Sequence, residues 1–405
     1  MKRIILHCDL NCFFASVEML LHKELRKVPM AVAGDPDHRH GIILAKNRLA
    51  KKCGVVTAET IQQARKKCPD LIIRQPDYAA YAHYSELVRN LYFQYTDRVE
   101  AFGIDECWLD VTASVAYFGS TEAIVSSIRK RVREEIGLTL SIGIADNKVF
   151  AKLGSDLAEE DSFRYVSGPA EIRNLPAGNL LNVGRTTAEK LKSFGICSIG
   201  DIADKPVSYL EEILGKCGRL IHAYACGQDD SPVSGFQDLP IAQSIGNTMT
   251  SYRDLTNIDD LKIVLSMLCD SVAGRLRNKG MYFKTVHLFL RDTNLKSRTL
   301  QVALKENSDL SKDIYEKALF LFEKNCSFAI PWRSIGVAVS NLSFRKEVSQ
   351  TGFFEDVSYS LKQKEEEKAI QTIRNRFGSG STLSLRSLED IRLAEISPKK
   401  RITKR

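Results

Sequence analysis

Residues 102–111 read Phe-Gly-Ile-Asp-Glu-Cys-Trp-Leu-Asp-Val, and the rest of the chain is organised around this stretch. Apolar, β-prone residues flank a short polar apex, which predicts two strands joined by a tight turn. Two adjacent carboxylates, Asp105 and Glu106, lie at that apex. Buried acids repel each other and are costly to desolvate unless a cation or a proton satisfies them. The alternative is a pair of solvated turn residues, because acids are common at turns.

A third carboxylate follows an apolar stretch near the N-terminus, where Ile-Ile-Leu-His-Cys at residues 4–8 leads into Asp9. Residues 3–9 therefore predict a buried strand that ends in an acid. Three carboxylates on neighbouring strand ends can hold two Mg²⁺ ions roughly 3.5–4 Å apart, the arrangement that drives in-line nucleotidyl transfer. After this strand, Asn11 is a candidate cap for the helix that follows.

Length and composition bound the class of protein. A chain of 405 residues predicts two to four domains, and 44% hydrophobic with 27% charged residues is typical of a soluble globular protein. A net charge of +8 is compatible with a polyanionic partner. The ten cysteines include no C-x-x-C pair, which indicates reduced thiols and a cytoplasmic protein. Neither a signal peptide nor an apolar stretch long enough for a membrane span is apparent.

Residues 9–18 resemble the opening motif of the Y-family translesion DNA polymerases, and residues 104–110 resemble the acidic signature of that family. Residues 141–156 resemble the next motif of the family. Together the three matches extend over the first 167 residues, and the nearest branch is the bacterial DNA polymerase IV group. The resemblance implies an error-prone, DNA-directed DNA polymerase for translesion synthesis and DNA repair. Its partners would be dNTP and primer–template DNA, and it would act as a monomer.

The same resemblance implies a multidomain α+β fold shaped like a right hand. Its parts are a palm of mixed sheet and helices (1–10 and 77–167), small fingers (11–76), a helical thumb with two helix-hairpin-helix motifs (168–234), a linker (235–243), an α+β little finger (244–345) and a tail (346–405). From the residues alone, 244–345 predict a four-stranded sheet backed by two helices, and 361–377 predict an amphipathic helix.

For the catalytic site, the resemblance implies that Asp9, Asp105 and Glu106 are catalytic. Two Mg²⁺ ions would be held by Asp9, Asp105 and the backbone carbonyl of Leu10, with Glu106 near the ion on the primer side. Phe14 would exclude a ribose 2′-hydroxyl by its bulk. The residues implied to bind the nucleotide are Asn11, Cys12, Phe13, Phe14, Arg48 and Lys51.

The chain departs from the family where the triphosphate is expected to bind. The usual Thr, Tyr and Arg of the fingers are Ala45, Arg48 and Lys51 here, and a usual Lys of the palm is Glu159. Lys51 keeps the charge but lacks the two-pronged geometry of Arg, and Glu159 reverses a charge. These changes support an alternative function, that of a weakly catalytic or inactive relative acting as a clamp-tethered DNA-binding adaptor. A nucleotidyl cyclase shares the two-metal chemistry, but paired helix-hairpin-helix motifs argue against it.

Three further segments suggest macromolecular contacts. Residues 181–191 and 214–220 resemble helix-hairpin-helix motifs, whose backbone N–H groups bind DNA phosphates. Asn182 stands where the motif usually has a turn glycine, and this change is tolerable because Asn readily adopts the left-handed conformation. Residues 350–356 resemble the peptide through which bacterial polymerases hold the sliding clamp. The implied DNA contacts are Gly184, Arg185, Thr186, Gly218, Thr250, Arg298 and Arg333, and the implied clamp contacts are Gln350, Phe353 and Phe354.

Overall fold

The computed structural model describes residues 3–34, 41–235, 242–344, 357–378, 381–382 and 388–394. The chain forms two compact units, and the division between them falls after Leu239. That position lies within residues 235–243, where the sequence predicts a linker. We refer to the parts before and after it as unit 1 and unit 2.

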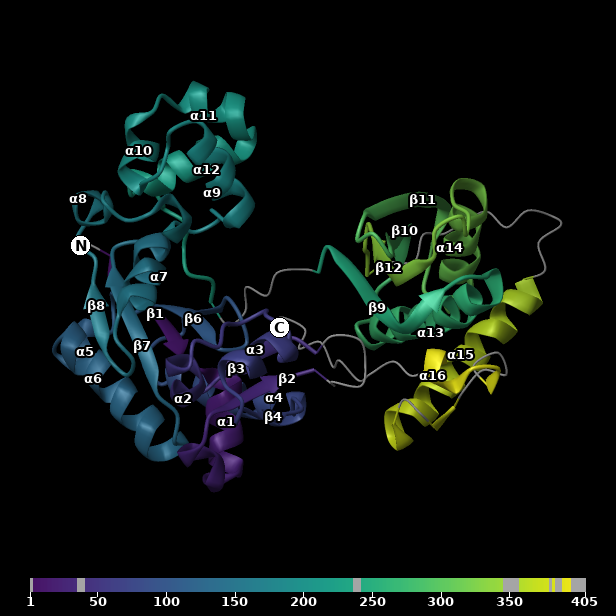
Figure 1. Cartoon of the computed structure of the whole chain (residues 1–405), viewed down its shortest axis with the longest axis horizontal. Helices are drawn as coiled ribbons and strands as arrows, with labels where there is room; N and C mark the ends of the chain where they lie inside the picture. The colour runs from purple at the N-terminus through teal and green to yellow at the C-terminus, as the bar shows by residue number, and fades with distance from the viewer. Residues whose placement is uncertain are drawn as a thin grey trace. The chain divides into compact units, whose positions relative to one another are not determined.

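Unit 1 is built on a five-stranded sheet in the order β5-β6-β1-β7-β8 (Figure 1). Its central strand β1 runs antiparallel to β6 and to β7, and β8 runs parallel to β7. β5 and β6 are antiparallel and enclose the acidic turn, so the predicted pair of strands is confirmed. The bounds are β1 (Ile5–Leu10), β5 (Val99–Ala101), β6 (Glu106–Asp110), β7 (Leu140–Ala145) and β8 (Phe163–Tyr165).

Helices cover both faces of this sheet. Alternate residues of a strand face opposite sides, and Leu6 and Cys8 of β1 join the core formed with α4 (Tyr78–Tyr92) and α6 (Thr121–Arg131). Ile5 belongs instead to the core formed with α7 (Lys148–Leu157), which packs on β1 and β7. His7 and Asp9 therefore share the α7 side of the sheet with Ile5. The connecting turns of helix are α5 (Val115–Phe118) and a π-helical turn (Val132–Ile136).

A smaller sheet in the order β3-β2-β4 has its own core. That core is closely packed because small side chains such as Ala31, Ala50 and Ala64 are fully buried in it. The elements of this part are α1 (Phe13–Leu21), a 3-10 turn (Lys23–Lys27), β2 (Met30–Ala33), β3 (Ile43–Lys46), α2 (Arg48–Lys52), α3 (Ile61–Lys67) and β4 (Ile72–Arg74).

Unit 1 continues with short helices. Asn182 has a φ of 69°, so the left-handed conformation predicted for this turn position is confirmed. Gly215, with a φ of 63°, separates two of the helices. The elements are α8 (Pro169–Ile172), a 3-10 turn (Ala177–Asn179), α9 (Arg185–Ser193), α10 (Ile199–Asp204), α11 (Val207–Leu214) and α12 (Lys216–Ala225).

Unit 2 contains a four-stranded antiparallel sheet in the order β11-β10-β12-β9 with two helices packed on it (Figure 1). This is the arrangement that the sequence of residues 244–345 predicts. One hydrophobic core fills the space between sheet and helices. The bounds are β9 (Ser244–Leu255), α13 (Ile258–Asn278), β10 (Phe283–Asp292), β11 (Ser297–Ser308), α14 (Ser311–Asn325) and β12 (Trp332–Ser340).

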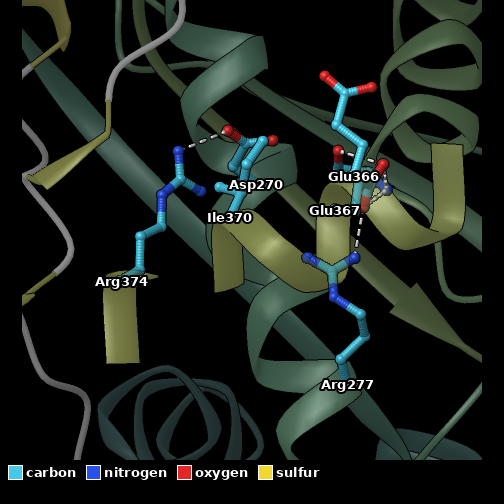
Figure 2. Close-up of a pocket in the computed structure, with 7 residues that line it drawn as sticks. Asp270, Arg277, Glu366, Glu367, Ile370 and Arg374 are labelled. Atoms are coloured by element: carbon cyan, nitrogen blue, oxygen red, sulfur yellow. Dashed lines mark hydrogen bonds and ion pairs between the residues drawn. The ribbon is translucent and has the colours of Figure 1, made fainter. Parts of the chain in front are cut away.

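A C-terminal extension packs against the helices of unit 2. Its long helix α15 (Val357–Phe377) includes the predicted helix 361–377, and α16 (Ile391–Ala394) inserts a fully buried Leu393 into the unit 2 core. Figure 2 shows two ion pairs that fasten α15. Arg277 of α13 pairs with Glu367, and Arg374 of α15 pairs with Asp270 at 3.2 Å. These four side chains line a polar pocket of about 170 Å³.

Candidate active site

The three acids that the sequence singles out come from two adjacent strands. Asp9 near the end of β1 is the direct partner of Glu106 at the start of β6. The backbone N–H of Leu10 donates to the carbonyl oxygen of Asp105 at 3.1 Å, which ties the acidic turn to the end of β1. The fold thus brings together Asp9 and the pair at residues 105–106, although nearly a hundred residues separate them in the sequence.

The pKa values of two of these acids record a surplus of negative charge. Burial, followed by the charges of Glu106 and Asp105, raises the pKa of Asp9 to about 7. Burial and the charge of Glu106 also raise the pKa of Asp105. Such shifts mean that ionised carboxylates lie close together in a poorly solvated place, where a divalent cation would stabilise them. Carboxylate and carbonyl oxygens are also the ligands that Mg²⁺ prefers, so these residues fit the implied ions.

Glu106 differs from the other two acids because an ammonium group and an imidazole lie beside it. The Nζ atom of Lys152 lies 3.3 Å from its Oε1 atom, and the Nε2 atom of His7 lies 3.7 Å from its Oε2 atom. Burial acts to raise the pKa of Glu106, but His7 and Lys152 outweigh it and the pKa is lowered. Among the described residues, no three His, Cys, Asp or Glu side chains are grouped as a ready metal site.

Asn11 does not cap α1, and the expectation of a cap is wrong. Cys12 is the N-cap residue, in a left-handed conformation with a φ of 50°, and no side chain caps the helix. Asn11 has tertiary partners instead: its Nδ2 atom donates to Ser141 Oγ at 2.8 Å, and its Oδ1 atom accepts from the Asp161 N–H at 3.0 Å. The side chain therefore links the end of β1 to the loop that follows α7.

Phe14 presents a rigid aromatic surface beside this turn. Its ring stacks on Tyr81 of α4 with centroids 4.3 Å apart and planes 12° apart. The Tyr81 hydroxyl donates to buried Glu18 at 2.6 Å, so the ring beneath Phe14 is itself fixed. Phe13 is 2% exposed and belongs to the core. In the sequence, this support for Phe14 is indicated only by the three-residue spacing of Tyr78 and Tyr81, which places both rings on one face of a helix.

Two expected phosphate contacts lie on α2, and an acid faces one of them. Asn47 caps α2 by accepting from the Ala50 N–H at 3.0 Å. Arg48 forms an ion pair with Glu160 at 3.2 Å. The pKa of Cys12 is raised by burial and by Glu160 and is lowered by Lys51, which indicates that both charged groups lie near that thiol. Comparison with the family pattern indicates Glu159 as the charge reversal, whereas the acid that meets Arg48 is its neighbour Glu160.

The expected DNA contacts in the short helices divide into two kinds. Gly184 precedes α9 as its N-cap residue, and Arg185 and Thr186 are exposed in the first turn. Gly218 is buried within α12, its N–H donates to the Gly215 carbonyl at 2.9 Å, and a Cβ atom there would lie 2.1 Å from the Leu210 oxygen. Gly218 therefore allows close packing of α12 on α11, and the left-handed turn position belongs to Gly215.

The register of the unit 2 sheet separates two of the expected DNA contacts. Thr250 is paired with Ser334, and their hydroxyl oxygens are 2.8 Å apart. Arg298 is paired with core residue Leu290, so it extends from the side of the sheet that the helices cover, and it donates to the Asn325 carbonyl at 2.8 Å. Arg333 lies at an irregularity in the pairing of β12. The expected clamp contacts Gln350, Phe353 and Phe354 lie outside the described residues.

Sequence and structure comparisons place the chain among known proteins. Residues 8–156 match the impB/mucB/samB family, and residues 242–352 match the C-terminal domain of that family. DNA polymerase IV of Acetivibrio thermocellus is 41% identical over 93% of this chain and 96% of its own length. DNA polymerase IV 2 of Bacillus subtilis is 32% identical over 96% of this chain and 95% of its own length.

A solved structure shows the same fold. A Y-family DNA polymerase chimera is 23% identical to this chain, with a TM-score of 0.74 over 84% of this chain and all of its own. The predicted multidomain α+β architecture is therefore confirmed. Among the described residues, no helix combines the length and apolar content that crossing a membrane requires.

Proposed function

This chain belongs to the impB/mucB/samB family, and from that premise we propose that it is a template-directed, error-prone DNA polymerase of translesion synthesis. It adds deoxynucleotides to a primer on a DNA template and so acts as a nucleotidyltransferase in the cytoplasm, as a monomer. The observation that carries the proposal is the direct pairing of Asp9 with Glu106, next to Asp105. Neither the relatives nor the described residues favour an inactive adaptor.

We assign two Mg²⁺ ions to Asp9, Asp105, Glu106 and the carbonyl oxygen of Leu10. When bound, such ions activate the primer hydroxyl and neutralise charge on the departing pyrophosphate. The protein contributes two hydrogen-bonded strand ends that fix the acids before substrate arrives, which lowers the reorganisation needed at the moment of reaction. The raised pKa values of Asp9 and Asp105 support this assignment, because they report carboxylates that are buried next to other acids.

The nucleotide would bind beside α1 and α2. Asn11 and Cys12 in the turn after β1 would contact it, buried Phe13 could do so only through its backbone, and Phe14 would leave no room for a 2′-hydroxyl group. Support from Tyr81 keeps the Phe14 ring from yielding to a ribose. Cationic Arg48 and Lys51 would attract the triphosphate, although Arg48 must exchange its carboxylate partner for a phosphate.

The rest of the chain is assigned to DNA and to the clamp. Residues 1–10 and 77–167 would be the palm, 11–76 the fingers, 168–234 the thumb and 244–345 the little finger. The start of α9, with Gly184, Arg185 and Thr186, suits a phosphate because no side chain caps the backbone N–H groups of its first turn. In the little finger Thr250 is the better candidate, since it lies on the side of the sheet opposite core residue Met249, whereas Arg298 extends from the side that the helices cover. A clamp contact at 350–354 rests on sequence alone.

Primer extension tests the proposal directly. The full chain with Mg²⁺, each dNTP and a primed template should extend the primer opposite the matching base. Asp105→Ala should reduce the rate by at least about 10³-fold, since an ion ligand of a two-metal site is lost. DNA affinity, followed by fluorescence anisotropy, should change by less than about twofold, because phosphate contacts elsewhere dominate binding.

The matched control is Asp70→Asn, which neutralises an exposed acid away from the strand ends. It should extend primers at the wild-type rate. Extension by Asp105→Ala at the wild-type rate would remove the metal assignment, and a wild-type chain that binds primed DNA without extending it would remove the proposed activity altogether.

A further inference from the structure

Lys152 on α7 occupies an unusual position among the acids of the active site. Its Nζ atom lies 3.3 Å from Glu106 Oε1 and 3.1 Å from Asp156 Oδ1. The side chain is only 14% exposed, and the ammonium group lies 5.9 Å from the centre of the Phe102 ring. An ammonium so poorly hydrated requires compensating charge, and carboxylates supply it here.

The influence of Lys152 reaches the other acids at the strand ends. It acts electrostatically on Asp9 and Asp105 as well as on its two direct partners. Four carboxylates therefore share this ammonium group. One positive charge cannot neutralise four carboxylates, so this arrangement differs from an ordinary salt bridge, in which one cation pairs with one anion.

The second carboxylate oxygen of Glu106 lies next to His7 but is not hydrogen-bonded to it. His7 is fully buried, and its Nδ1 atom is 2.7 Å from Ser155 Oγ. Its Nε2 atom is 3.7 Å from Glu106 Oε2, beyond hydrogen-bonding range, and has no hydrogen-bond partner. Among the described residues, Lys152 is therefore the group that donates a hydrogen bond to the Glu106 side chain.

Lys148, one turn earlier on the same helix, shows what a complete pair looks like. It is 12% exposed, and its Nζ atom lies 2.7 Å from both oxygens of Glu100 in β5. Glu100 also accepts the N–H of Ser234 at 2.9 Å. Two lysines of one helix, equally buried, thus pair with two acids of neighbouring strands, but only Lys152 faces the acids of the strand ends.

We propose that Lys152 is a resident counter-cation that holds Glu106 towards α7, and that Glu106 must release Lys152 before it can act together with Asp9 and Asp105. The inference rests on the proposed polymerase function and adds a positioning residue to it. Lys152 and a divalent ion would then compete for the same carboxylate.

Loss of the competing charge should tighten metal binding. Removing a positive charge a few ångströms from a site for a divalent ion raises its affinity roughly tenfold, if the effective dielectric is nearer that of water than of the protein interior. A lysine with only a structural role would lower stability and leave metal affinity unchanged. Metal affinity without DNA or nucleotide is therefore the decisive quantity.

The experiment measures Mn²⁺ binding to the full chain by the electron paramagnetic resonance signal of free Mn²⁺. Lys152→Gln should bind Mn²⁺ roughly tenfold more tightly than wild type, whereas Lys152→Arg, which keeps the charge, should stay within about threefold of wild type. Lys148→Gln is the matched control and should stay within about twofold, because its charge lies with Glu100. Lys152→Met serves as a second neutral variant of similar length should Lys152→Gln fold poorly.

Two results would overturn the inference. Equal shifts for Lys152→Gln and Lys148→Gln would show that any charge on α7 acts alike, and unchanged or weaker Mn²⁺ binding by both neutral variants at Lys152 would show that the ammonium group does not compete. A wild-type chain that extends primers while its variants fail this test would sink only the role of Lys152. A wild-type chain that neither binds Mn²⁺ nor extends primers would sink the proposed function.

Discussion

Two groups of acidic side chains, one in each unit, use the same residue types with opposite results. In unit 2, Asp270 pairs with Arg374 and Glu367 pairs with Arg277, so each of these two carboxylates has a guanidinium partner (Figure 2). In unit 1, the acids at the ends of β1 and β6 share the ammonium of Lys152, and the pKa of Asp9 rises to about 7. We call the unit 2 group the balanced cluster, because its charges cancel and it fastens one helix to another. We call the unit 1 group the unbalanced cluster, because its excess of negative charge favours binding of a cation.

Neutralising one acid in each cluster should have the most unequal effect on catalysis. Asp9→Asn should slow primer extension by at least about 10³-fold, because it removes a proposed metal ligand. Asp270→Asn should change the extension rate by less than about threefold, because it only weakens the attachment of α15. Rates from single-turnover primer extension at saturating dNTP provide the comparison. Similar losses in both variants would mean that the balanced cluster is also part of the active site.

Stability should respond in the reverse order. Glu367→Ala leaves Arg277 without its carboxylate in a place where its side chain is 12% exposed, which should cost unit 2 about 3 kcal/mol. Glu106→Ala should cost unit 1 less, because the loss of a Lys152 partner is offset by relief of repulsion on Asp9. The charge swap Arg277→Glu with Glu367→Arg should recover part of the loss in unit 2 if the pair itself is responsible.

The two tryptophans allow each unit to be followed separately. The chain has Trp108 in β6 and Trp332 in β12, one in each unit. Urea unfolding in EDTA, monitored by fluorescence in a Trp108→Phe or a Trp332→Phe background, reports the free energy of unfolding of the other unit. Equal destabilisation of the two units by their respective Glu→Ala changes would contradict the distinction between balanced and unbalanced clusters.

A dependence of stability on pH should appear in the unbalanced cluster. The folded-state pKa of Asp9 is raised from 3.8 to about 7, so the folded chain binds this proton more tightly than the unfolded chain. The metal-free protein therefore loses stability as pH rises from about 4 to about 7, and the loss remains at higher pH. The lowered pKa of His7 acts oppositely below its ordinary value of 6.5, since the folded chain disfavours protonated His7.

Thermal unfolding in EDTA at pH 5.5 and pH 8 isolates the contribution of Asp9. The change in Tm from pH 5.5 to pH 8 should be about 5 °C more positive in Asp9→Asn than in wild type. Mg²⁺ should also stabilise this variant less than wild type. Asp270→Asn should show the wild-type difference. A wild-type dependence on pH in Asp9→Asn would mean that another group titrates.

The sequence predicts the unbalanced cluster better than the balanced one, and the reason is local order. An apolar strand that ends in Asp9 and a β-prone pair of strands around Asp105 are each visible within ten residues. Their pairing across nearly a hundred residues is indicated by the resemblance to a family and not by either local pattern. The four residues of the balanced cluster lie on two helices almost a hundred residues apart, namely Asp270, Arg277, Glu367 and Arg374. The sequence pattern does not predict which of the many charged residues on these helices will form ion pairs.

Side-chain direction was the other quantity beyond reach of the sequence. That Glu106 faces Lys152, that Phe14 lies on Tyr81 and that Gly218 is buried against α11 all depend on helices packing at specific positions. Resemblance to a family indicates which residues gather at a site. It leaves open how departures such as Arg48 and Glu160 compensate one another.

The smallest expected effect concerns that last pair, which is the exposed counterpart of the two clusters. The Arg48 side chain is 70% exposed and the Glu160 side chain 38%, so solvent screens their attraction and the pair contributes little to stability. Under the proposed function its consequence would lie in nucleotide binding, since Glu160 and a triphosphate would compete for the same guanidinium group. Glu160→Gln should lower the KM for dNTP about threefold and leave kcat unchanged, as expected when an interaction of the free enzyme alone is removed.

Glu159→Gln is the matched control for this effect, because it neutralises the adjacent residue, for which the described residues offer no ion pair. Screening should limit its effect on KM to less than about 1.5-fold. If the two variants lower KM equally, the general negative charge of the loop opposes the triphosphate, and Arg48 has no special part in it. If only Glu160→Gln lowers KM, and the effect vanishes in an Arg48→Gln background, then a carboxylate that is neither structural nor catalytic sets how readily this site accepts a nucleotide.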